Sequence, residues 1–157
     1  MREFMTDTSD IILAAGRGVS EEGARLLREL AELINGEAVA TRGAVEKGLF
    51  PYEAEVGIGG KKVFPILYVN FGTSGAYFHM AGVKTDCPVV TINKDRRARS
   101  MEIADHAICA EANSVLADMV SEIKTWSETD RNNGSAEDHG SHIFGYRQCK
   151  YTAADGM

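Results

Sequence analysis

Residues 65–82 read PILYVNFGTSGAYFHMAG, an apolar run that ends abruptly in a glycine-rich turn. The run Ile66–Phe71 is short and, apart from Asn70, apolar, as expected for a central strand of a parallel sheet. Gly72–Gly75 ends the strand, and the AYFHMAGV stretch that follows predicts a short helix. Strand, glycine turn and helix in this order predict one unit of an α/β fold.

The same pattern recurs on both sides of this segment. Ile11–Ala15 predicts another buried strand, and the turn Gly16-Arg17-Gly18 leads into a helix that Ser20 should cap and Asn35-Gly36 should end. Further elements are expected as strands at 37–42, 88–93 and 106–110, short helical segments at 44–48 and 101–105, and a final helix from Ala112 to about Trp126. We therefore expect an α/β fold built on a Rossmann-like open parallel sheet with helices on both faces.

The length of 157 residues predicts a single domain. Residues 1–9 are polar and are expected to form a loose lead-in, with the folded domain at 10–126. From 127 to 157 the composition turns to Asn, Gly, Ser, Asp and His, which predicts a flexible tail. Within this tail, Ile143, Phe144, Tyr146 and Tyr151 are the side chains that could dock on another surface.

Composition excludes several classes of function. The net charge of −6 disfavours nucleic-acid binding, and the short basic run at Arg96, Arg97 and Arg99 is interpreted as a solvated loop. Cys87, Cys109 and Cys149 lack the spacing of a metal site or of a disulfide framework, which favours a reducing cytoplasm. No apolar stretch is long enough for a membrane helix, and no apolar signal core is present at the N-terminus.

Candidate ligand-binding residues follow four of the predicted strands. In open parallel sheets, ligands bind beyond the carboxyl ends of the strands. The residues expected there are Gly16-Arg17-Gly18, Thr41-Arg42, Gly72–Gly75 and Asn93–Asp95. Each has a plain structural explanation by itself, and a lone His79 on an apolar helix is more often a buried core residue than a functional one. Their joint position at strand ends favours a nucleotide-type ligand, with an anion at the helix that Gly72–Gly75 opens.

Six motifs, in order, resemble the C-terminal domain of electron transfer flavoprotein alpha subunits over about Ile11 to Ile123. The long match is P-x-L-Y-x-x-x-G-x-S-G-A-x-x-H-x-A-G at residues 65–82, which is highly specific. The shorter matches are Gly16-Arg17-Gly18, Thr41-Arg42, Val56-Gly57 with Gly60-Lys61, Ile92–Asp95 and Ala104-Asp105. The resemblance implies a DHS-like NAD/FAD-binding type of sheet, standing here without the N-terminal domain of that subunit.

The resemblance also implies FAD, in an extended pose, as the cofactor of an electron carrier rather than of an enzyme with its own substrate. It places Arg42 against the isoalloxazine ring, Ser74, Gly75 and Ala76 at the pyrophosphate, His79 near the flavin N1/O2 edge, and Asn93 and Asp105 at the adenosine end. A positive Arg42 would stabilise the negative charge of reduced flavin. The full set of implied cofactor-binding residues is Gly16, Arg17, Gly18, Thr41, Arg42, Gly57, Gly59, Gly60, Gly72, Ser74, Gly75, Ala76, His79, Asn93, Lys94 and Asp105.

The implied partners are a dehydrogenase, an acceptor, and either a beta-type subunit or a second copy that covers the flavin. The sequence departs from the family where Gly57-Ile58-Gly59-Gly60 replaces a G-Q-T-G loop that carries a hydroxyl beside flavin N5, and where Arg96–Arg99 replaces a proline-rich stretch. The phosphate-contacting residues match better than the residues that tune the flavin. The alternatives are therefore a module that binds AMP or another adenine nucleotide without redox function, and an interaction scaffold without a ligand.

Overall fold

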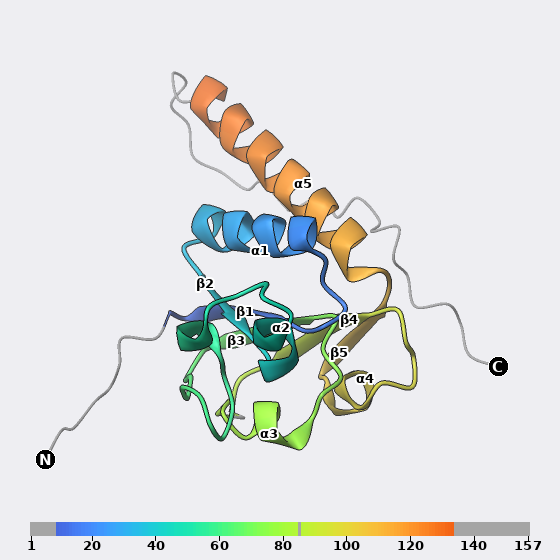
Figure 1. Cartoon of the computed structure of the whole chain (residues 1–157). Coiled ribbons are helices and arrows are strands. Elements are labelled where there is room, and N and C mark those ends of the chain that lie inside the picture. The colour runs from blue at the N-terminus through green and yellow to red at the C-terminus, as the bar shows by residue number, and fades with distance from the viewer. Residues whose placement is uncertain (1–8, 85, 134–157) are drawn as a thin grey trace, which may run out of the picture.

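The computed structural model describes residues 9–84 and 86–133 and contains one parallel sheet (Figure 1). The sheet has the strand order β2-β1-β3-β4-β5. Its strands are β1 (Ile11–Ala15), β2 (Glu37–Ala40), β3 (Leu67–Phe71), β4 (Val89–Asn93) and β5 (His106–Cys109). This order reverses direction between β1 and β3, which is the point where doubly wound sheets bind their ligands. The prediction of an open parallel sheet is confirmed.

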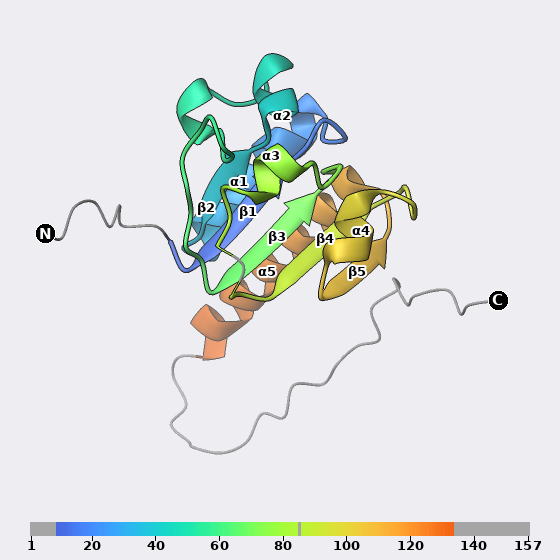
Figure 2. The same cartoon turned by 90° about the horizontal axis from the view of Figure 1, so that it is seen from below.

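Helices lie on both faces of the sheet, as predicted. Helices α1 (Glu21–Leu33) and α5 (Ala112–Asn133) stack on one face. Short segments lie toward the other face and the strand ends, and Figure 2 shows α3 and α4 in front of the sheet from below. These segments are α2 (Arg42–Glu46), the 3-10 helix η1 (Tyr52–Ala54), α3 (Tyr77–Met80) and α4 (Arg99–Ile103).

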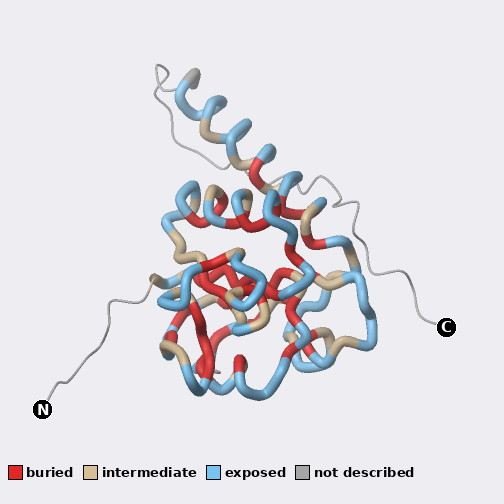
Figure 3. The backbone as a smooth tube through the Cα atoms, viewed as in Figure 1, coloured by how far each residue is buried: buried red, intermediate tan, exposed pale blue. Residues whose placement is uncertain are grey.

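The strands alternate their side chains between two apolar clusters. Leu13 and Phe71 point to the cluster under α1 and α5, which also contains Leu27, Leu30 and Leu116. The opposite cluster is smaller and contains Ile12, Val39, Val56, Val63, Tyr68, Val83, Cys87 and Val89. Because side chains alternate along a strand, each buried strand supplies both clusters, and this accounts for its continuous apolar sequence. The buried centre between the layers is red in Figure 3.

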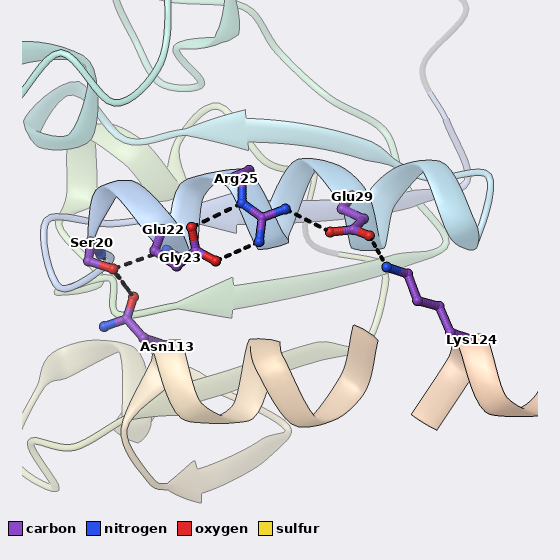
Figure 4. Close-up of polar contacts among 7 residues, drawn as sticks. All are labelled: Ser20, Glu22, Gly23, Arg25, Glu29, Asn113 and Lys124. Atoms are coloured by element: carbon purple, nitrogen blue, oxygen red, sulfur yellow. Dashed lines mark hydrogen bonds and ion pairs between the residues drawn. The ribbon is translucent and has the colours of Figure 1, made fainter. Parts of the chain in front are cut away.

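Polar contacts fix α1 against α5 (Figure 4). The Ser20 hydroxyl caps α1 by accepting a hydrogen bond from Gly23 N, and it donates to Asn113 Oδ1 of α5 at 3.0 Å. A Cβ at Gly23 would lie 2.0 Å from Asn113 Oδ1, so glycine permits this close approach. Farther along, Glu29 pairs with both Arg25 of α1 and Lys124 of α5.

Several predicted ends were wrong. Helix α5 does not end near Trp126 but continues to Asn133, into the segment predicted as tail. The added turns are polar, and they include side-chain bonds to the backbone such as Thr129 Oγ1 to Thr125 O at 2.9 Å. Helix α2 starts at Arg42 rather than at 44, and α4 spans Arg99–Ile103 rather than 101–105. The apolar side chains predicted to dock lie in 134–157, outside the described residues.

None of the helices described within 9–133 is long and apolar enough to cross a membrane.

Candidate functional site

Hydrogen bonds connect the carboxyl ends of all five strands into one continuous edge. Thr41 N, just after β2, donates to Ala15 O at 2.9 Å, and Gly16 N donates to Phe71 O at 2.9 Å. Gly72 N then donates to Ile92 O at 2.9 Å, and Ala110 N donates to Asn93 O at 3.2 Å. The expected gathering of Gly16, Arg42, Gly72 and Asn93 along one edge of the sheet is therefore confirmed. We refer to the loops after β1 to β5 as the carboxyl edge.

Glycines bring two loops into contact at the switch point between β1 and β3. Gly18 N donates to Gly72 O at 3.2 Å. A Cβ at Gly16 would lie 2.2 Å from that same carbonyl oxygen, which no larger residue could accommodate without moving the backbone. Arg17, between the two glycines, is exposed, and its side chain passes over Gly43 at the start of α2. The two glycines of the GRG motif thus pack against the loop after β3 at the switch point, and Arg17 leaves one cation exposed beside it.

The loop after β3 presents one polar side chain to solvent. Gly72 and Gly75 have φ of 62° and 76°, the left-handed region that glycine adopts without strain. Ser74 is exposed, and its backbone carbonyl accepts from Ser100 N at 3.1 Å. Thr73 Oγ1 is buried and has no hydrogen-bond partner. The exposed Ala76, after Gly75, is the N-cap residue of α3. This loop therefore offers a free hydroxyl at Ser74.

Arg42 is the first residue of α2, just after β2, and faces solvent. The hydroxyl of Thr41 is used locally, because it caps α2 by accepting from Ala44 N. The side chain of Arg42 is 79% exposed, and its Nε lies 2.9 Å from Glu46 Oε1. The hydrogen bond and charge of Glu46 raise the pKa of Arg42, so the guanidinium is always positive. The structure thus places a fixed cation beside the switch point.

The glycine-rich loop at 57–60 lies against α3. Ile58 N donates to Phe78 O at 2.8 Å, and a Cβ at Gly57 would lie 2.7 Å from that oxygen. Gly60 is equally confined, since its Cβ would lie 2.3 Å from Glu55 O. Gly59 differs, because nothing lies within 4 Å of its Cβ position. The loop is held at both ends and leaves open space in front of Gly59.

His79 faces the protein interior with both ring nitrogens engaged. Nδ1–H donates to Val56 O at 2.9 Å, and Nε2 accepts from the Tyr68 hydroxyl at 2.7 Å. Burial lowers the pKa of His79 and raises that of Tyr68, so both side chains are neutral near pH 7. A contact between His79 and the flavin would require the ring to leave one of these partners. The geometry favours the interpretation of His79 as a satisfied core residue.

The structure does not bring all the predicted residues together. Asn93 lies at the carboxyl edge, and its amide donates to Thr73 O at 2.8 Å while the exposed Lys94 follows it. Asp105 precedes β5, and its carboxylate accepts from Val89 N at the start of β4 at 2.7 Å. In a parallel sheet, strand starts and strand ends lie on opposite edges. Asp105 is therefore separated from the other predicted residues.

Two further features lie near the carboxyl edge. Glu111 follows β5 directly, and its carboxylate caps α5 by accepting from Asn113 N and Ser114 N. The strand-end rule could have selected Glu111, since it follows the predicted strand 106–110. An exposed apolar surface next to the glycine-rich loop comprises Tyr52, Ile58, Tyr77 and Phe78. Hydrogen bonds connect its segments: Tyr52 OH donates to Gly59 O, and Ile58 N donates to Phe78 O of α3.

Comparison with known proteins agrees with this geometry. A sequence model described as "Electron transfer flavoprotein FAD-binding domain" matches residues 6–84. The chain belongs to the electron transfer flavoprotein FAD-binding domain family. The chain is also 41% identical over 115 residues to Protein FixB of Clostridium saccharobutylicum, covering 73% of this chain and 34% of that protein.

Other relatives of this FAD-binding domain are named as alpha subunits. The electron transfer flavoprotein subunit alpha of Bacillus subtilis is 41% identical over 115 residues, which is 73% of this chain and 35% of that protein. The mitochondrial alpha subunit of Oryza sativa subsp. indica is 39% identical over 114 residues, which is 72% of this chain and 32% of that protein. The chain thus spans about a third of the length of these relatives. The resemblance drawn from the motifs is confirmed.

The residues of the carboxyl edge fit FAD, the cofactor of this family. The free Ser74 hydroxyl can donate to a phosphate oxygen, and the exposed Arg42 can pair with negative charge. Nothing lies within 4 Å of a Cβ at Gly59, so the loop is open on that side. Asn93 and Thr41 use their side chains within the protein, so their contacts with a ligand would run through remaining lone pairs or the backbone. The individual contacts remain predictions.

Proposed function

We propose that this domain binds FAD along its carboxyl edge and carries electrons between a dehydrogenase and an acceptor. The observation that supports it most is the continuous edge itself, which gathers Gly16–Gly18, Arg42, Gly72–Ser74 and Asn93 in a chain that belongs to an FAD-binding family. Bound FAD supplies the redox chemistry, since flavins accept and release electrons. The residues of the chain supply binding, orientation and charge.

Each group at this edge has a role that follows from its chemistry. Ser74 and the loop around it hold the pyrophosphate, while the glycines at 16, 18 and 72 let the backbone approach a ligand. Arg42 stabilises the reduced ring because its charge is fixed. His79 does not contact the cofactor itself. It hydrogen-bonds both Val56, which precedes the glycine-rich loop, and Tyr68 of β3, and so holds in place the loop that faces the ring.

The exposed apolar surface supports a companion subunit. Tyr52, Ile58, Tyr77 and Phe78 are each more than half exposed, with Phe78 at 71%. Such a surface next to a cofactor site is expected to be covered by protein, which also keeps water from the ring. We propose that a beta-type subunit or a second copy of this chain covers it. The cysteine content favours a cytoplasmic location for this assembly.

The absorption spectrum of the purified chain, after incubation with FAD and removal of excess, tests the function. We expect flavin absorbance that stays with the protein. Arg42→Ala should retain the fold but lower the flavin potential, because loss of a cation near a developing negative charge destabilises the reduced form. A tenfold change in the ratio of affinities corresponds to about 59 mV for one electron. Colourless protein that binds ADP or AMP would contradict the electron-carrier function and support the nucleotide-binding alternative.

A further inference from the structure

Four cationic side chains lie in the loop between β4 and α4 or at its end. Lys94, Arg96, Arg97 and Arg99 are all exposed, and this loop lies on the pale-blue, exposed right-hand side of Figure 3. None of the ion pairs found among residues 9–84 and 86–131 involves these four side chains. Only Asp95 and Glu102 carry negative charge in the same stretch. We call the segment 94–99 the basic loop.

The net charge of the basic loop is opposite in sign to that of the whole chain. The whole sequence carries a net charge of −6, yet this loop is positive, with four cations and a single carboxylate at Asp95. A solvated loop needs no such concentration, because scattered charges of both signs keep a surface soluble equally well. The concentration of one sign at one place is the feature that steers a partner of the opposite sign.

Hydrogen bonds within the loop hold its shape. Asp95 N donates to Asn93 Oδ1 and Arg97 N donates to Asp95 Oδ1, both at 2.9 Å, while Ala98 N donates to Asp95 O at 3.1 Å. These are two successive side-chain turns with a backbone turn across them. A loop that is ordered before binding loses less conformational entropy when it meets a partner.

The loop is also attached to the candidate cofactor site. Ser100, which follows it directly, donates from Oγ to Thr73 O at 2.6 Å and from its backbone to Ser74 O at 3.1 Å. A Cβ at Gly75 would lie 2.4 Å from Ser100 N, so the two loops are in direct backbone contact. The cations therefore stand beside the loop that carries Ser74.

We propose that the basic loop is a docking surface for an acidic face of a protein that exchanges electrons with this domain. The inference rests on the proposed function, because a carrier must meet its partners quickly and transiently. Opposite charges raise association rates and orient the encounter without requiring a tight complex. A protein partner fits better than a nucleic acid, since the acidic remainder of the chain repels a long polyanion while a compact acidic face need touch only this loop.

Fluorescence anisotropy with a short labelled poly-L-glutamate peptide tests the proposal. The variant combines Arg96→Ser, Arg97→Ser and Arg99→Ser, and the matched control combines Lys62→Ser, Lys84→Ser and Arg131→Ser. The control removes the same charge from exposed side chains elsewhere on the surface. We expect the loop variant to bind the peptide on the order of tenfold more weakly at low salt, and the control to lose little. Binding should fall as salt shortens the Debye length to about 8 Å.

Four outcomes decide between the interpretations. Equal weakening in both variants would overturn the proposal, because net charge alone would then explain binding. Displacement of the peptide by excess FAD or pyrophosphate would also overturn it, since the arginines would belong to the phosphate site. Tighter binding of a labelled single-stranded RNA than of the peptide would overturn the choice of a protein partner. Loop-dependent peptide binding by a chain that takes up no FAD would refute the redox role alone, and flavin absorbance in the same samples separates that case.

Discussion

Two long helices cover one face of the sheet, whereas loops and one-turn helices cover the other. The first face buries the larger apolar cluster, and α1 and α5 are locked together by Ser20 with Asn113 and by Glu29 with Lys124. The second face buries a smaller cluster and contains the buried polar groups His79, Tyr68, Asn70 and Thr91. Stability is concentrated on the helical face. The loop-covered face buries less apolar surface, and its loops form part of the carboxyl edge.

The largest effect is expected from a deletion in the helical face. Leu27 of α1 is fully buried, so Leu27→Ala should lower the free energy of unfolding by about 2–5 kcal/mol. Val63→Ala, in the opposite cluster, should cost less, about 1 kcal/mol. Urea unfolding measures both, and FAD affinity of the folded Leu27→Ala variant should stay unchanged. A larger loss from Val63→Ala than from Leu27→Ala would contradict the proposed division between the faces.

His79 should give the loop-covered face a pH dependence just below neutral pH. Burial holds the pKa of His79 below its value in the unfolded chain, so the unfolded state binds more protons as pH falls. Stability is therefore fully present above about pH 6.5, the unfolded pKa, and is lost progressively as pH falls through the folded pKa. Melting temperatures between pH 8 and acidic pH measure it.

Two variants make this pH effect specific. His79→Phe should flatten the dependence below neutral pH, at a cost of about 1–3 kcal/mol for leaving Val56 O and the Tyr68 hydroxyl without partners. His106→Asn, at an exposed position, should keep the dependence of the parent chain. If His79→Phe retained the full dependence, a different group would be responsible.

The smallest effect on stability is expected in the glycine-rich loop. Gly59→Thr should change the free energy of unfolding by less than about 0.5 kcal/mol, because its Cβ enters open space. Gly60→Thr should destabilise clearly, since its Cβ would collide with Glu55 O. In the FAD-loaded protein, the hydroxyl that Gly59→Thr introduces should change the difference between the two one-electron reduction potentials of the flavin. Unchanged potentials in a folded variant would mean that this loop does not face the flavin N5.

The sequence was sufficient to predict the strands and their shared edge. Buried parallel strands must be apolar on both faces, so Ile11–Ala15 and the run that ends at Phe71 are recognisable without any structure. The resemblance to the family could also be recognised, because residues 65–82 carry a long and specific motif.

Other features depend on three-dimensional contacts that local sequence does not carry. Helix α5 continues beyond its last apolar positions to Asn133, and the polar residues of this final part show no periodicity that would predict a helix. The position of Asp105 is different in kind: Asp105 precedes and Glu111 follows the same short strand, so the strand-end rule alone would have selected Glu111 for the carboxyl edge. The Tyr68–His79–Val56 connection joins three separate segments, which only the folded chain brings together.

Chemical-shift mapping of the backbone amides during an FAD titration tests the central claim most directly. The account predicts that FAD perturbs the carboxyl edge: the amides of 16–18, 41–42, 57–60, 72–76 and 93–94 should move together, with one affinity. The amides of Val89 and Asp105, at the opposite edge, should stay in place. Perturbations centred on Val89 and Asp105, with the loops at Gly16 and Gly72 unchanged, would contradict a cofactor site at the carboxyl edge.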